Sequence, residues 1–177
     1  RDCQIYRINL PAADDFLNKY HLQGTCKGQL LCLGLVKDDM LYQIMTFGKA
    51  RYDKRHDIEL LRLCTRTGYS IVGGAGKLFS YATSEYALNN IISYCDISKF
   101  SGHVYENIGM QLISILPPQI IWSKQDKFVE DKLLRQCSYN QLFKTAYDKE
   151  TSDEELMLKH GWLPVPDCGK RVFEYSK

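Results

Sequence analysis

The spacing of apolar side chains divides the middle of the chain into strands and helices that alternate. Short apolar runs at residues 58–64 and 90–96 have the length and composition of strands. A helical pattern follows the first run, from Val72 to Tyr81, and a shorter one follows the second, at residues 101–109. Strands that alternate with helices are typical of βαβ units with parallel pairing. We therefore expect this stretch to form the centre of an α/β sheet.

The rest of the chain adds strands and helices to this centre. Further strands are expected at residues 3–9, 30–36, 40–47, 111–122 (interrupted by Pro117-Pro118) and 171–175, and helices at 11–19, 127–136 and 153–160. The strands before and after residues 37–39 are predicted to form a hairpin. The first helix carries Asp14 and Asp15 in its first turn, where the helix dipole favours acids. The sum is a mixed sheet of six or seven strands flanked by helices.

Length and composition indicate one folded protein. The 177 residues suit a single domain, with a helical insertion at about residues 124–160 before the last strand. Ser152 or Asp153 is expected to cap the last helix. Hydrophobic residues make up 45% of the chain, and no apolar run approaches the roughly 18 residues that a membrane span needs. The net charge of +2 does not by itself indicate a nucleic-acid partner. We expect a cytoplasmic protein that does not enter a membrane.

The cysteines favour a reducing environment. Their number, seven, is odd, and no CxxC pair is present, which argues against a disulfide framework. The histidines do not fall at zinc-ligand spacing from any cysteine pair, so no metal site is expected. Three cysteines are interpreted as small apolar core residues, namely Cys32, Cys64 and Cys95.

The helix after the first central strand opens with a glycine-rich run, Val72-Gly73-Gly74-Ala75-Gly76-Lys77. Glycines at a helix start leave the first N–H groups bare and let an anion approach the backbone. A P-loop is excluded, because it needs four residues between its glycines and a Ser or Thr where Leu78 stands. The dinucleotide fingerprint also fails, on glycine spacing and on the missing acidic residue. Two interpretations stay open: a phosphate cradle, or glycines that allow close packing of helix and sheet.

Two motifs resemble the GCN5-related N-acetyltransferases (GNATs). The run Ser70-x-x-Gly73-x-Ala75 followed by Leu78 is similar to the superfamily's pyrophosphate-binding motif, with Ser70 where Gln or Arg is usual. Residues 105–110 are similar to its next signature, a helical tyrosine followed by glycine and a hydrophobic residue. The resemblance implies a GNAT fold and an acyltransferase that uses acetyl-CoA or another acyl-CoA. Ser70 implies that one side-chain contact to phosphate is missing.

Shorter pieces spread over the chain resemble a narrower group. FLNKYHLQG, MTFGK, ELLR, SYCD and GWLPVPDCGKRVFEY are similar to phage-encoded acetyltransferase-fold proteins. These include Mom-type DNA modification proteins and domains found beside phage homing endonucleases. The resemblance implies an acyltransferase that modifies a nucleobase in DNA, in the cytoplasm of a host cell.

Acyl transfer assigns roles to particular residues. The cofactor-binding candidates are Leu63 of the central strand and the helix-opening Val72, Gly73, Gly74, Ala75, Gly76 and Lys77. A splayed central strand could offer backbone N–H groups to the thioester carbonyl. By resemblance, Tyr105 would be the general acid for the leaving thiolate.

The acceptor amine needs a group that orients it or removes its proton. Asp96 follows the second central strand, where open α/β sheets place their ligands. Glu59 is a second candidate base, and His21 matches a histidine of the resembling proteins. Each has a structural alternative: a buried aromatic for Tyr105, a turn residue for Asp96, a solvated carboxylate for Glu59 and a helix cap for His21.

The segment at residues 49–57 is basic and is the candidate DNA contact. Its candidate contact residues are Lys49, Arg51, Tyr52, Lys54 and Arg55. An enzyme acting on a base needs single-stranded or flipped DNA, for which Tyr52 or Phe47 could supply stacking. A solvated loop is the alternative. Two other functions also stay open: an N-acetyltransferase of a small amine or protein, and a non-catalytic DNA-binding module beside a nuclease. A homodimer is the assembly that stays open.

Overall fold

The computed structural model describes residues 2–130 and 151–177. These residues form two compact units. The first unit consists of Arg1–Cys95, Phe100–Ile115 and Arg171–Lys177, and the second of Asp96–Lys99 and Leu116–Lys170. The single domain with an insertion stays a prediction.

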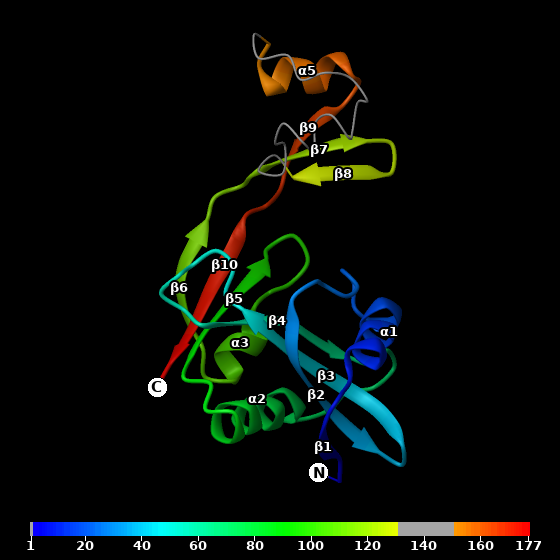
Figure 1. Ribbon diagram of the computed structural model, residues 1–177, viewed down its shortest axis with the longest axis vertical. Helices are drawn as coiled ribbons and strands as arrows, with labels where there is room; N and C mark the ends of the chain where they lie inside the picture. Colours follow the sequence, from blue (N-terminus) through cyan, green and yellow to red (C-terminus); the bar gives the residue numbers. More distant parts are fainter. Residues whose placement is uncertain (1, 131–150) are drawn as a thin grey trace. The chain divides into compact units, whose positions relative to one another are not determined.

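The first unit is built on a seven-stranded mixed sheet with the order β1-β2-β3-β4-β5-β10-β6 (Figure 1). Strands β1 to β4 pair as antiparallel neighbours, and β4 pairs with β5 in parallel. The strands are β1 (Gln4–Arg7), β2 (Gln29–Lys37), β3 (Met40–Lys49), β4 (Ile58–Thr65), β5 (Asn90–Asp96), β6 (Gln111–Leu116) and β10 (Lys170–Ser176). The expected mixed sheet with a parallel pair at its centre is confirmed.

Helices cover both faces of this sheet (Figure 1). Helix α1 (Leu10–Tyr20) packs with Cys32 and Cys64 on one face. Helix α2 (Gly74–Glu85) packs on the other face, where the partly buried Tyr105 of the short α3 (His103–Asn107) joins the same core. The alternation of β2 explains both contacts, because successive side chains of a strand point to opposite faces. The expected core positions of Cys32, Cys64 and Cys95 are confirmed.

Helix α1 begins one residue earlier than expected, at Leu10. Asn9 is its N-cap, and the Asn9 Oδ1 accepts a hydrogen bond from the N–H of Ala12 at 2.9 Å. No acid lies in the first turn, so the expectation for Asp14 and Asp15 was wrong. The reason is that an Asn cap next to Pro at the first turn outweighs the dipole preference as a start signal.

The turn between β2 and β3 has the geometry that the hairpin requires. Asp38 and Asp39 both adopt positive φ, at 49° and 59°. Two consecutive left-handed residues give the turn that matches the twist of paired strands, and Asp tolerates this conformation better than most residues. The predicted hairpin is therefore confirmed.

The second unit has a three-stranded sheet in which β7 (Ile120–Lys124) lies between β8 (Lys127–Glu130) and β9 (Leu163–Pro166). Its core is formed by Trp122, Trp162 and Met157 of α5 (Asp153–Lys159).

Ser152 caps α5, and its side chain and that of Glu155 form a capping box, which confirms the predicted cap. The helix expected at 127–136 is wrong over its first four residues, which form β8 because Val129 pairs opposite Trp122. The rest of that helix lies outside the described residues.

No helix of residues 2–130 or 151–177 has the length and apolar character to cross a membrane.

Candidate functional site

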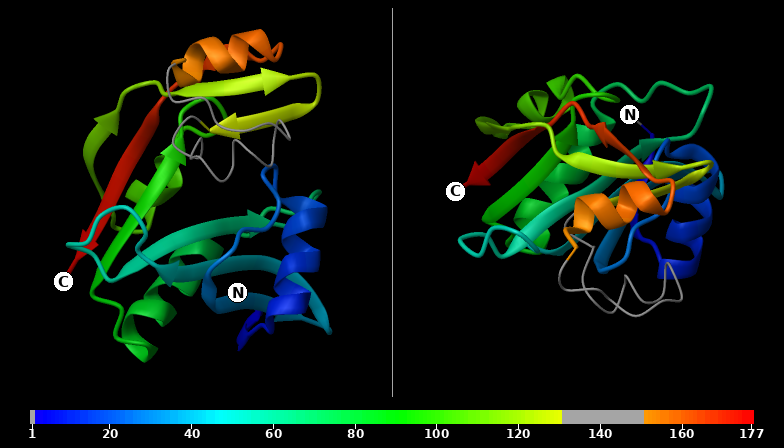
Figure 2. Two further views of the ribbon diagram at one scale, coloured as in Figure 1. Left: turned by 45° about the horizontal axis from the view of Figure 1, so that its top comes forward. Right: turned by 90° about the horizontal axis from the view of Figure 1, so that it is seen from above.

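The parallel pairing of β4 and β5 ends almost as soon as it begins. Ile58 pairs with Ile91 and Glu59 with Ile92, and no later pair joins the two strands in the described chain. Figure 2 shows the strands separating from this shared start. Backbone N–H and C=O groups that lose a partner strand need another hydrogen-bonding partner. The diverging part of β4 includes the half-buried Leu63, one of the predicted cofactor-binding residues.

Side-chain hydroxyl groups lie where the strands part. The Ser93 hydroxyl on β5 donates to the Leu60 carbonyl on β4 at 2.9 Å. Tyr105 stacks on Phe173, with ring centroids 4.8 Å apart, and a side-chain hydrogen bond joins its hydroxyl to Ser93. Burial raises the pKa of Tyr105, so the phenol keeps its proton. The structure therefore places the predicted acid at the divergence, and also packs its ring in the core.

Some backbone N–H groups in the first turn of α2 have no hydrogen-bond acceptor among the described residues. Gly73, the N-cap, is left-handed with φ 72°. The N–H of Gly74 donates to a carbonyl of the preceding turn at 3.0 Å, and that of Lys77 donates to Gly73 at 2.9 Å. Within the described residues, the N–H groups of Ala75 and Gly76 have no such partner. Two of the six predicted cradle residues thus present donors that an anion could use.

The glycines of this turn have different roles. A Cβ at Gly74 would lie 2.3 Å from the Oε1 of Gln43, so this glycine is required for close packing of helix against sheet. A Cβ at Gly76 would meet nothing within 4 Å. The close-packing interpretation therefore applies at Gly74, whereas the phosphate cradle stays a prediction, with open space at Gly76.

Side chains around the turn contribute little to it. Val72 is 97% exposed, and Ser70 is exposed as well. The Nζ of Lys77 donates to the carbonyl of Cys3, so this ammonium is already engaged. The groups that this turn offers to an anion are therefore backbone N–H groups.

Glu59 is buried, contrary to the solvated alternative. Its carboxylate binds Arg51 through two contacts, Nη2 to Oε1 at 3.1 Å and Nε to Oε2 at 3.4 Å. The Arg51 guanidinium also lies over the ring of Tyr52, 5.6 Å from its centroid. Tyr52 in turn meets Tyr94 edge to face at 5.7 Å. The expectation that Phe47 could stack on a base is wrong, because its side chain is buried in the core. The ion pair and the two aromatic rings join the basic loop to β4 and β5.

The basic loop is partly neutralised by its own carboxylate. Arg55 binds Asp53 at 2.6 Å, and Arg51 is held by Glu59. Lys49 and Lys54 are exposed and have no carboxylate partner in the part of the chain that the structure describes. Of the four predicted cations, these two lysines are the ones available to phosphate.

His21 is the C-cap residue of α1, as its structural alternative held. Its Nδ1 accepts from the N–H of Gln23 at 3.1 Å. Burial, and then the positive charge of Arg62, lower the pKa of His21 to about 4. Arg62 itself donates to the carbonyls of Gly24 at 3.1 Å and Leu61 at 2.9 Å. His21 is therefore neutral at pH 7.

Asp96 ends β5 and has the contacts of a turn residue. Its carboxylate accepts from the N–H and hydroxyl of Ser98 at 3.0 and 2.6 Å, and from the Nζ of Lys99 at 2.8 Å. Burial alone would raise the pKa of Asp96, but these donors outweigh burial and lower it. The geometry matches the turn alternative.

Two residues at the divergence were not predicted from the sequence. Arg62 exerts a charge on both His21 and Tyr105, and Ser93 bonds across the parting strands. The signal was present, since each is a polar residue flanked by apolar or aromatic residues inside a strand run. The charge of Arg62 therefore acts on two of the predicted site residues, His21 and Tyr105. No cluster of His, Cys, Asp or Glu in residues 2–130 and 151–177 could hold a metal ion.

No protein-family model matches the chain, and no curated protein matches it either. Solved structures do match along nearly the whole chain. A Bacillus subtilis acetyltransferase in complex with CoA is 10% identical, with 99% of each chain covered and a TM-score of 0.56. A GNAT family acetyltransferase from Elizabethkingia anophelis with acetyl-CoA bound is 8% identical, with 100% of each chain covered and a TM-score of 0.56.

An aminoglycoside 6'-acetyltransferase type Ii is 12% identical over 98% of this chain and 96% of its own, with a TM-score of 0.52. Identities this low show the fold alone. The chain has the GNAT fold, which confirms the predicted fold class.

The pKa of His21 can be measured directly. We expect its imidazole to be neutral at pH 7 and to titrate near pH 4 instead of its ordinary 6.5. Between pH 6.5 and about 4 the unfolded chain binds a proton at His21 that the folded chain does not bind. The free energy of unfolding therefore decreases as the pH falls through this range. Arg62→Gln should raise the pKa. NMR titration tests both, and an ordinary value for His21 in the wild type would contradict the burial argument.

Proposed function

We propose that the protein is an acyl-CoA-dependent acyltransferase whose reaction site is the divergence of β4 and β5. The observation that carries the proposal is the combination of three features in one compact unit. These are the parted strands, the free N–H groups at the start of α2, and the protonated Tyr105 hydroxyl beside Ser93. Proteins with this fold include acetyltransferases with CoA and acetyl-CoA bound.

The start of α2 would hold the pyrophosphate of acyl-CoA. The N–H groups of Ala75 and Gly76 are free, and the positive end of the helix dipole favours an anion there. The thioester supplies the activated acyl group. Unpaired backbone of β4 around Leu63 would polarise its carbonyl, as an oxyanion site does.

The remaining groups handle protons. Tyr105 holds a proton that it would give to the leaving sulfur, because burial keeps its phenol protonated. Glu59 would orient the acceptor amine, since its carboxylate is buried beside the divergence and bound by Arg51. His21 is neutral at pH 7, but its lowered pKa makes it a weak base.

We further propose DNA as the acceptor. The supporting observation is the exposed ring of Tyr52, flanked in the same loop by the unpaired Lys49 and Lys54. A stacked base with cations on either side is the arrangement that single-stranded nucleic acid binding uses. A small amine or a protein is the alternative acceptor, and a non-catalytic DNA-binding module is the alternative to an enzyme.

A charge at Gly76 tests the cradle without disturbing the core. Gly76→Asp places a carboxylate beside the free N–H groups, whereas Gly76→Asn adds nearly the same volume without charge, and neither Cβ clashes. We expect Asp to weaken acetyl-CoA binding about tenfold or more, and Asn to change it much less. Calorimetry measures both. Gly74 is unsuitable, because a side chain there would collide with Gln43.

The wild type decides between the function classes in the same experiment. If it binds neither CoA nor acetyl-CoA but does bind DNA, the enzyme proposal fails and the non-catalytic module replaces it. Equal losses for the two Gly76 variants would place the anion elsewhere.

Removing the Tyr105 hydroxyl should slow turnover and leave cofactor binding intact. A general acid acts in the transition state, so Tyr105→Phe should lower turnover by roughly 10²–10⁴-fold. Tyr81→Phe, another tyrosine packed against the same core, is the matched control. Release of free CoA in the presence of single-stranded DNA is the measurement. Unchanged turnover with a lower melting temperature would assign Tyr105 to the core alone.

The DNA proposal is tested with Lys49 and Lys54, whose ammonium groups have no carboxylate partner among the described residues. Lys49→Ala with Lys54→Ala should flatten the dependence of log K on log salt for single-stranded DNA by about 1.4, two contacts at roughly 0.7 each. Acetyl-CoA binding should not change. Lys19→Ala with Lys37→Ala removes the same charge elsewhere and is the control.

Mass spectrometry of nucleosides from DNA of cells that express the protein completes this test. A modified nucleoside supports DNA as the acceptor. If the Lys49 and Lys54 variant binds DNA as tightly as the wild type, or if no modified nucleoside forms, a small amine replaces DNA as the proposed acceptor.

A further inference from the structure

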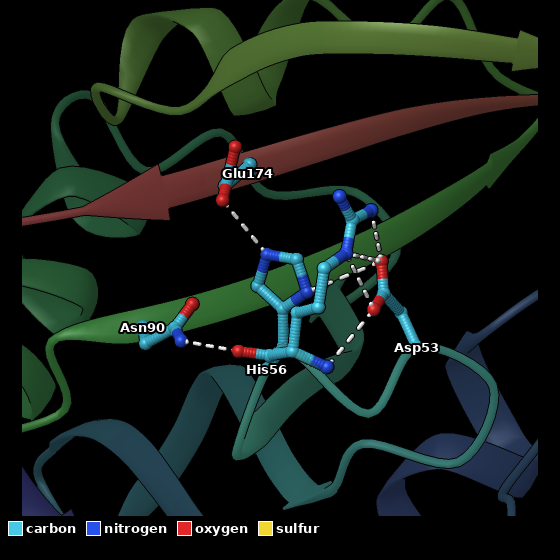
Figure 3. Close-up of polar contacts among 5 residues, drawn as sticks. Asp53, His56, Asn90 and Glu174 are labelled. Carbon is cyan, nitrogen blue, oxygen red and sulfur yellow. Dashed lines mark hydrogen bonds and ion pairs between the residues drawn. The ribbon is translucent and has the colours of Figure 1, made fainter.

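The loop between β3 and β4 contains a buried histidine that the proposed reaction does not use. The side chain of His56 is 2% exposed. Its Nε2 lies 2.9 Å from the Oε1 of Glu174 on β10, and its Nδ1 lies 3.4 Å from the Oδ2 of Asp53 in the loop (Figure 3). The ring therefore lies between carboxylates from two separate parts of the first unit.

Other contacts fasten the same loop to the sheet. The side-chain amide of Asn90, the first residue of β5, donates to the carbonyl of Arg55 at 2.7 Å. The Arg55 guanidinium in turn binds Asp53. At the base of the loop, the N–H of Ala50 donates to the carbonyl of Asp57 at 3.1 Å. The His56 ring thus faces the carboxylates of Asp53 and Glu174, while Asn90 and Arg55 fasten the loop around it.

The same loop also carries Arg51 and Tyr52, which lie next to the proposed acceptor site. Arg51 binds the buried Glu59 on β4, and Tyr52 meets Tyr94 on β5. An exposed arginine pays side-chain entropy when it is held in one geometry, so its ion pair depends on how well its backbone is fixed. Four residues separate Arg51 from His56, so the tether at His56 fixes the segment that presents the guanidinium.

Polar burial of this kind restricts geometry more than it adds stability. Burying the imidazole removes it from water, a cost that its attraction to the partly exposed carboxylates offsets only in good geometry. Hydrogen bonds have direction, whereas apolar contacts do not. The His56–Glu174 contact therefore sets where the loop lies on β10.

We propose that His56 is a positioning residue: its hydrogen bond to Glu174 holds the loop of residues 50–57 on β10, and thereby places Arg51 against Glu59. The consequence for acceptor binding rests on the proposed function. The link between His56 and the Arg51–Glu59 ion pair is independent of the proposed function, because it concerns contacts within the folded chain.

The test uses Glu174, which is 35% exposed and can be changed with little risk to the core. Glu174→Ala removes the acceptor of the hydrogen bond, and Glu174→Gln keeps an oxygen that Nε2–H can reach. The first measurement is NMR of the Arg51 Nε–H signal together with amide hydrogen exchange of residues 50–57. We expect Glu174→Ala to speed exchange in the loop about tenfold and to shift the Arg51 signal. Glu174→Gln should behave as the wild type.

The second measurement is kinetic, with acetyl-CoA and a single-stranded DNA oligonucleotide. Glu174→Ala should raise KM for DNA several-fold, with kcat and acetyl-CoA affinity little changed. In an Arg51→Ala background the same substitution should have no further effect on KM, because its effect passes through Arg51.

The outcomes separate the two proposals. Unchanged exchange and an unchanged Arg51 signal in Glu174→Ala overturn the positioning role, as does a KM effect that persists without Arg51. Equal loss in Glu174→Ala and Glu174→Gln also overturns it, since the retained oxygen would then not matter. Absence of any reaction with DNA would count against the acceptor alone, because the NMR arm still decides the role of His56.

Discussion

The structure depends on the early end of the parallel pairing between β4 and β5. Two residue pairs join these strands, and beyond them the backbone of β4 lacks its partner on one side in the described chain. An open edge in the middle of a sheet is costly unless side chains or ligands satisfy it. Ser93 satisfies one carbonyl, and Tyr105 is fixed beside it by stacking on Phe173. Ser93 and Tyr105 thus lie where the two strands part, on the side of β4 that faces β5.

Most elements of the first unit could be predicted from the sequence, because their signals are local. The strand at Asn90–Asp96 was predicted to the residue, and the hairpin before it follows from two adjacent aspartates. Prediction failed where distant contacts decide. Phe128 and Val129 are spaced as in a helix together with later leucines, but Val129 lies opposite Trp122 and forms a strand. Local periodicity cannot distinguish the two, since the partner strand decides.

The candidate site was only partly predictable for the same physical reason. Glycines at a helix start indicate free N–H groups, but which glycine packs and which faces open space depends on Gln43 of a neighbouring strand. The loop's positive residues indicate a basic surface, but the Arg51 guanidinium is bound to the buried carboxylate of Glu59, which neutralises its charge. A formal charge counted along the sequence therefore overstates the charge that reaches a ligand. The role of His56 could not be predicted, because Glu174 is 118 residues away in the chain.

The central claim is that the divergence of β4 and β5 is built to receive an acyl-CoA thioester. A crystal structure of the wild-type protein grown with acetyl-CoA tests this most directly. The account predicts the pyrophosphate on the N–H groups of Ala75 and Gly76, and the thioester carbonyl between the parted strands with the Tyr105 hydroxyl next to its sulfur. Acetyl-CoA bound at another surface would contradict the account. So would a complex with acetyl-CoA in which β4 and β5 pair as far as Leu63.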